Sequence, residues 1–152
     1  MIRRPPRSTL DRSSAASDVY KRQVLLAKQF LKSRLSETDE IYAEVSNEIR
    51  FIDAGANFGS VSCPVCGAEI SDEWWSAAMD EAHKSQFINL DVVVPCCSSK
   101  ANLNHLNYNF PQGFARFVLS AKNPGIPEFD EQSRDELERI VGCKLRVIWT
   151  HY

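Results

Sequence analysis

The sequence lacks the features that mark several large protein classes. No apolar run approaches the roughly 18 residues that a membrane-spanning helix needs, so we expect no membrane partner. The loop from Asp53 to Gly59 contains two glycines, but it has neither the spacing nor the lysine of a phosphate-binding loop. No pair of carboxylates and no combination of a nucleophile with a base stands out. The sequence therefore indicates no enzyme class.

The first 23 residues do not look like natural protein sequence. Residues 1–9 and 13–23 resemble in-frame translations of a sequencing flow-cell adapter and of a transposase-type read primer, with residues 10–12 at the place of a sample index. Segments of non-native origin are excluded before a fold is considered. We expect residues 1–23 to be disordered and residues 24–152 to form a single zinc-binding domain. The resemblance also implies a metagenomic chain whose natural start is missing.

Removing this segment changes the charge balance of the chain. The whole chain has 18 basic and 20 acidic residues. The first 23 residues carry six of the basic and two of the acidic ones, so 12 basic residues face 18 acidic ones in the remainder, a formal net charge of −6. Nucleic-acid-binding domains usually present a basic surface. The scarcity of basic residues therefore argues against a nucleic-acid partner.

Hydrophobic periodicity predicts an α+β fold. We expect helices at residues 24–35, 71–86 and 130–141, and strands at residues 41–45, 49–53, 88–94, 105–110, 115–121 and 145–149. The larger elements from the first cysteine pair onward follow the order of a ferredoxin-like split β-α-β fold, an antiparallel sheet with two main helices. The helix at residues 24–35 and the first two strands would add an N-terminal helix and hairpin.

Four of the five cysteines lie in two short turns. Cys63 and Cys66 belong to a Cys-Pro-Val-Cys-Gly sequence, and Cys96 and Cys97 follow a proline. Thiolates at this spacing can converge on one tetrahedral ion, usually zinc. Gly67 can adopt a left-handed conformation, which lets backbone N–H groups point at the sulfurs. We expect a structural Zn2+ site with four cysteine ligands.

The adjacent cysteines leave a second set of ligands open. Neighbouring residues in a strand point to opposite faces, so Cys96 and Cys97 can bind one ion only if the chain turns there. The alternative set uses the first cysteine pair, one cysteine of the second pair, and either His105 or His83. A third interpretation is that the cysteines are buried free thiols. We expect this last state for Cys143.

The runs CPVCG, EWW, PCC and LNYNFPQGFARF are similar to a small uncharacterised bacterial domain family with CPxCG and PCC zinc turns. The resemblance covers most of residues 50–152. It implies a zinc-ribbon-like metal site and no particular activity. We therefore expect a cytoplasmic, non-enzymatic zinc-binding domain that binds another protein as an interaction or regulatory module.

Two other functions stay open at this point. The first is a zinc-ribbon protein that binds nucleic acid by stacking bases on the aromatic residues Tyr108, Phe110, Phe114 and Phe117. The second is a cysteine-dependent redox or thiol enzyme, which needs a reactive thiolate. A zinc ion bound by all four sulfurs would leave no position for a water molecule and would exclude this chemistry at the site.

Overall fold

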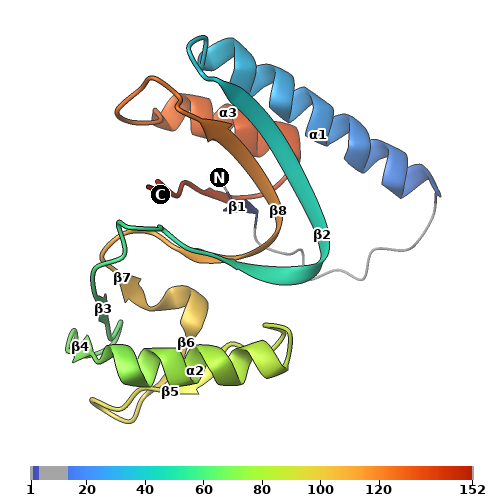
Figure 1. Cartoon of the computed structure of the whole chain (residues 1–152). Helices are drawn as coiled ribbons and strands as arrows, with labels where there is room; N and C mark the ends of the chain where they lie inside the picture. Colours follow the sequence, from blue (N-terminus) through green and yellow to red (C-terminus); the bar gives the residue numbers. More distant parts are fainter. Residues whose placement is uncertain (1, 4–13, 152) are drawn as a thin grey trace. The chain divides into compact units, whose positions relative to one another are not determined.

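The structure is a computed structural model that describes residues 2–3 and 14–151, and it confirms the α+β class (Figure 1). The helices are α1 (Ser14–Arg34), α2 (Asp72–Lys84), α3 (Glu131–Val141) and a short 3-10 helix η1 (Leu103–His105). The strands are β1 (Ile2–Arg3), β2 (Glu40–Ile52), β3 (Val61–Ser62), β4 (Glu69–Ile70), β5 (Asp91–Val93), β6 (Lys100–Asn102), β7 (Asn107–Tyr108), β8 (Gly113–Lys122) and β9 (Leu145–Arg146).

The chain divides into two compact units. Unit 1 comprises Met1–Val45 and Arg116–Val147, and unit 2 comprises Ser46–Ala115 and Ile148–Tyr152. Each unit has a hydrophobic cluster of its own. The long strands β2 and β8 contribute residues to both units, and the expectation of one domain for residues 24–152 stays a prediction.

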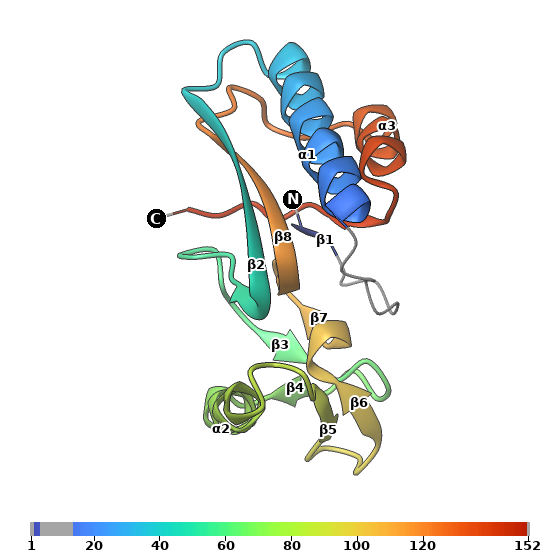
Figure 2. The same ribbon diagram turned by 90° about the vertical axis from the view of Figure 1, so that its right-hand side faces the viewer.

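Unit 1 contains a four-stranded sheet with the order β2-β8-β1-β9. Figure 2 shows α1 and α3 side by side on one face of the sheet. Apolar residues from both helices and from β8 form the core, because their helical and alternating spacings place them on inward faces. Its buried members are Ala27, Leu31, Leu35, Phe117, Leu119, Leu137 and Val141.

Helix α1 begins inside the adapter-like segment. Residues 14–23 lie in this helix, although we expected residues 1–23 to be disordered. Residues 1 and 4–13 lie outside the described residues. The Tyr20 ring packs edge-on against Phe117, with 6.3 Å between the ring centroids, and Val24 packs against the same core. These contacts stabilise the helical conformation in this part of the chain, because packing of an apolar face supplies most of a helix's stability in a protein.

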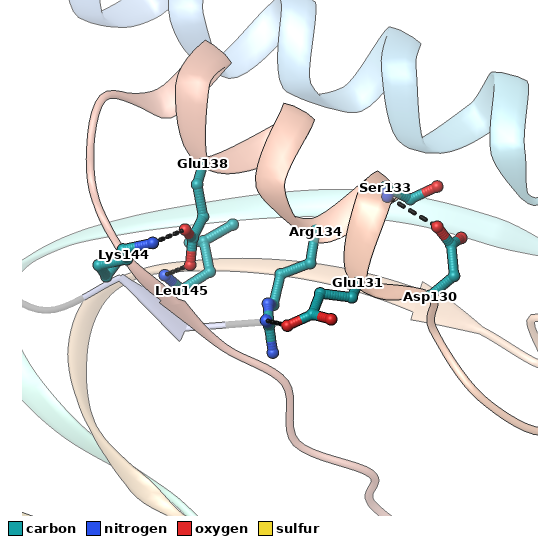
Figure 3. Close-up of polar contacts among 7 residues, drawn as sticks. All are labelled: Asp130, Glu131, Ser133, Arg134, Glu138, Lys144 and Leu145. Atoms are coloured by element: carbon teal, nitrogen blue, oxygen red, sulfur yellow. Dashed lines mark hydrogen bonds and ion pairs between the residues drawn. The ribbon is translucent and has the colours of Figure 1, made fainter.

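Polar contacts lie at both ends of α3 (Figure 3). Ser133 N donates to Asp130 Oδ1 at 2.8 Å, so Asp130 is the N-cap. Gly142 ends the helix with a φ of 72°. Glu138 accepts hydrogen bonds from Leu145 N at 2.8 Å and from Lys144 Nζ at 2.7 Å, which fixes the chain that follows the helix.

Unit 2 contains α2, the three-stranded sheet β4-β3-β7 and the two-stranded sheet β5-β6. Ser71 caps α2 by accepting a hydrogen bond from Trp74 N at 3.3 Å, as serine commonly does at a helix N-terminus. Trp74, Trp75 and the buried Ala82 pack on the core, so both tryptophans face inward. The other buried members of this core are Val61, Cys63, Ile70, Val94, Leu103, Leu106 and Phe114.

The predicted N-terminal hairpin is wrong, and the expected strands at residues 105–110 and 115–121, which we had interpreted as a second hairpin, do not pair with each other. Residues 41–52 lie in one continuous strand, β2, because the polar residues 46–48 contain no glycine or proline that would turn the chain. Strand β7 pairs with β3, whereas β8 belongs to the four-stranded sheet. Tyr108 Oη donates to Leu103 O at 2.7 Å and accepts from Trp75 Nε1 at 3.3 Å, so β7 is attached to the core of unit 2.

The predicted strand at residues 88–94 is shorter than expected and only partly buried. Strand β5 spans three residues, and the side chains of Ile88 and Val93 are 71% and 57% exposed.

The ferredoxin-like order is not confirmed, because α2 packs in the core of unit 2 and α3 in that of unit 1. Within the described part of the chain, no helix combines the length and the apolar character required to cross a membrane.

Truncating Leu137 tests the core of unit 1. Leu137 is fully buried, so Leu137→Ala should lower the free energy of unfolding by about 2–5 kcal/mol through lost burial and a new cavity. Leu25 is 55% exposed, and Leu25→Ala is the matched control with little expected effect. Urea unfolding of both variants measures the difference, and equal losses would contradict this packing.

Glu138 should make unit 1 sensitive to acid. Burial raises the pKa of this carboxyl group, but the hydrogen bonds from Leu145 N and Lys144 Nζ outweigh burial and lower the pKa overall. A lowered carboxyl pKa stabilises the fold above the unfolded value of about 4.3, and this stabilisation is lost as the pH falls through the folded value. Glu138→Gln should therefore destabilise the protein more at pH 7 than at pH 3. Thermal unfolding at both pH values measures this, and a pH-independent effect would refute it.

Candidate metal centre

The first cysteine turn connects β3 to β4. These strands pair through Val61 with Ile70 and through Ser62 with Glu69. Within the turn, Cys63 N donates to Ala68 O at 2.8 Å and Gly67 N donates to Cys63 O at 3.0 Å. Gly67 has a φ of 76°, the left-handed conformation that the sequence predicted. The turn thus brings Cys63 and Cys66 to one end of the strand pair.

The second cysteine turn repeats the hydrogen bonds of the first. Val94 N donates to Ser99 O at 3.0 Å, Ser98 N donates to Val94 O at 3.0 Å, and Ser98 has a φ of 56°. Val94 therefore occupies the position that Cys63 has in the first turn, and Cys97 occupies that of Cys66. Cys96 stands at the position of Val65. The turn lets two adjacent cysteines point toward one centre, which a straight strand would prevent.

The four sulfur atoms lie together. The Sγ atoms of Cys63, Cys66, Cys96 and Cys97 are all within 4.8 Å of one another. Cys66 Sγ lies 3.3 Å from Cys96 Sγ, and Cys63 Sγ lies 3.8 Å from Cys97 Sγ. Four thiolates around a tetrahedral zinc ion, each about 2.3 Å from the metal, are about 3.8 Å apart. The donor set therefore fits such an ion.

The environments of the four thiols differ. Cys63 is fully buried in the core of unit 2, whereas Cys66, Cys96 and Cys97 are exposed. The backbone N–H groups of Cys66 and Val65 point at Cys63 Sγ and lower the pKa of this thiol to about 6. The neighbouring sulfurs, first that of Cys66, raise the pKa of Cys96 to about 12. Because like charges at this spacing oppose one another, a bound cation would favour the thiolate form of all four.

The structure does not bring the histidines to the cysteines. Within residues 2–3 and 14–151, the four cysteines are the one group of His, Cys, Asp and Glu side chains found close enough to hold a metal. His83 packs edge-on against Phe87, with 5.4 Å between the ring centroids, and His105 ends η1. Cys143 packs against the core of unit 1. The geometry thus favours the set of four cysteines over the sets that include His83 or His105.

The aromatic residues considered for base stacking are mostly inaccessible. Phe114 and Phe117 are 3% and 2% exposed, and the Tyr108 hydroxyl is hydrogen-bonded within unit 2. Only Phe110 of these four residues has a largely accessible side chain, with 41% exposed. These side chains therefore form no stacking surface.

Comparison with family models, with curated proteins and with solved structures yields no match for this chain. The interpretation of the cysteine site consequently depends on its own geometry and chemistry.

The equivalence of the two turns was not predicted from the sequence. Both contain a proline two positions before the last cysteine, in Pro64-Val65-Cys66 and Pro95-Cys96-Cys97, and a small residue follows. This shared spacing could have indicated the equivalence, but the second turn has Val94 at the position where the first turn has Cys63. Ser99 was also missed as a contact, since its Oγ lies 3.2 Å from Cys97 Sγ.

The two left-handed positions give a matched pair of substitutions. A Cβ at Gly67 would meet no atom within 4 Å, so Gly67→Ala should cost only backbone strain, about 1 kcal/mol. Ser98 already has this strain, and Ser98→Gly should stabilise the protein by up to about 1 kcal/mol. Denaturant unfolding of both variants measures the two effects. Effects of the same sign would contradict the equivalence of the turns.

Proposed function

We propose that Cys63, Cys66, Cys96 and Cys97 bind one structural zinc ion and that the protein is a non-enzymatic, zinc-ribbon-like interaction module. The observation that carries this proposal is the approach of all four sulfurs to within 4.8 Å of one another. Four sulfur donors in tetrahedral array are typical of structural zinc sites, and the equivalent backbone hydrogen bonds of the two turns support a ribbon-like arrangement.

A metal ion with four protein thiolates has no coordination position open to water. The site would therefore serve the fold rather than a reaction, in contrast to catalytic zinc sites with three protein ligands. The fully buried Cys63 supports this role, because it connects the site directly to the core of unit 2.

The zinc ion would connect segments that short strands hold weakly. Strands β3 and β4 have two residues each, and β5 and β6 have three each. The sulfurs of Cys66 and Cys96, which are 30 residues apart, come from different strand pairs. In small domains the free energy of metal binding becomes folding free energy. Zinc would thus fix the start and the end of the segment that contains α2 and β5.

The interaction role is supported by the surface of α2. This helix begins with Asp72 and Glu73, continues with Asp80 and Glu81, and has Lys84 near its end. Charged groups across an interface are arranged so that their potentials are complementary. A basic or neutral protein segment therefore suits this surface better than the phosphate backbone of a nucleic acid.

Native mass spectrometry of the full chain tests the metal assignment. We expect one zinc ion per chain, and single Ser substitutions at each of the four cysteines should abolish its retention or weaken it strongly. Cys143→Ser is the control, because Cys143 belongs to the core of unit 1, and it should keep the zinc. Cobalt(II) replacement should produce the absorption bands of tetrahedral thiolate coordination.

The same series distinguishes the alternatives. Removal of zinc by a chelator should unfold unit 2, which amide hydrogen exchange of residues 46–115 detects. A chain that binds no metal and retains its folded exchange pattern would refute the structural role. A thiol that is alkylated rapidly in the metal-loaded protein would instead favour a thiol enzyme.

A further inference from the structure

Unit 2 has an open groove between α2 and β5. Its volume is about 570 Å³, and its apolar lining includes Trp74, Ala77 and Ala78 from α2 and Val92 from β5. Ala77 and Ala78 have short side chains, which leaves space beside the strand. In Figure 2, β5 lies between α2 and β6, so the edge of β5 that faces away from β6 is directed toward α2.

This edge of β5 has backbone groups without strand partners. Leu103 N donates to Leu90 O at 2.8 Å, and Val94 N donates to Ser99 O at 3.0 Å. In this antiparallel register the backbone N–H and C=O groups of every second residue, at positions 90, 92 and 94, point toward β6. The backbone of Asp91 and Val93 therefore points to the opposite edge. Asn89 Oδ1 accepts the N–H of Asp91 at 3.1 Å. The N–H and C=O groups of Val93 have no partner among the described residues.

Unpaired edge groups are a template for an additional strand, and many domains bind extended peptides in this way. The side chain of Val93 is 57% exposed, so it remains accessible in the open groove. A peptide strand beside β5 would direct alternate side chains toward the apolar lining of the groove.

The charges of the groove specify the partner further. Its lining contains Glu81, Asp91 and Lys84. Lys84 pairs with Glu81, whereas Asp91 Oδ1 accepts a hydrogen bond from Asn102 Nδ2 at 2.8 Å and has no cationic partner within the described part of the chain. Strand addition by a second copy would bring two acidic grooves together. A basic residue in the added strand would compensate Asp91.

We infer that the groove between α2 and β5 binds an extended segment of another protein, in which apolar and basic residues alternate, by strand addition to β5. This inference rests on the proposed function, since β5 leads into the second cysteine turn and zinc would hold this turn in place. It adds the position and the chemical class of the partner to the interaction role.

Selection from a displayed library of random ten-residue peptides on the zinc-loaded full chain tests the inference. Retained peptides should alternate apolar with basic residues and contain no proline at the centre. Val93→Pro removes the N–H donor at the free edge, and fluorescence anisotropy should show binding weakened by about tenfold or more. Asp91→Lys should weaken binding as well, whereas Glu128→Lys makes the same charge change at an exposed residue of unit 1, outside the groove, and should not.

Each other outcome has a definite meaning. Failure to retain any peptide, or equal binding to wild type and Val93→Pro, would overturn the inference. A dimer in analytical ultracentrifugation that Val93→Pro dissociates would overturn it too, because the occupant would be a second copy. Zinc content is measured for every variant, and Val93→Pro should retain the metal. Peptide binding by a folded but zinc-free chain would refute the zinc proposal and support the groove.

Discussion

Two separate turns of unit 2 bring four sulfur atoms within 4.8 Å of one another. Each turn is closed by the same pair of backbone hydrogen bonds and contains one residue in the left-handed conformation. Backbone N–H groups lower the pKa of Cys63, whereas the neighbouring sulfurs, first that of Cys66, raise the pKa of Cys96. A bound divalent cation would favour the thiolate form of all four cysteines. This effect connects the geometry of the turns to the proposed role of zinc.

This constraint extends from the metal site to the surface. The segment between the turns contains α2 and β5, which enclose the groove proposed to bind a peptide. An edge strand of three residues gains little stability from its own hydrogen bonds. Attachment of its end to a metal turn, and packing of Val92 and Val94 in the core, would keep such an edge ordered and accessible. The proposed structural metal would therefore support the strand edge to which the peptide is proposed to bind.

Local signals in the sequence predicted the elements better than their partners. The helices near residues 71–86 and 130–141 and the left-handed conformation of Gly67 were predicted, because each depends on neighbours within a turn or two. The continuity of β2 and the pairing of β7 with β3 were not, since they depend on contacts between distant residues. The cysteine set was predicted from spacing, whereas the convergence of Cys96 with the other three required the turn at Ser98.

X-ray absorption spectroscopy at the zinc edge, on the purified full chain, is the most direct measurement of the central claim. It reports the identity, number and distance of the atoms bound to the metal. The proposal predicts four sulfur atoms at about 2.3 Å and no nitrogen or oxygen in the first coordination shell. A spectrum with three or fewer sulfur atoms and an additional nitrogen or oxygen, or a chain without zinc, would contradict a closed site formed by Cys63, Cys66, Cys96 and Cys97.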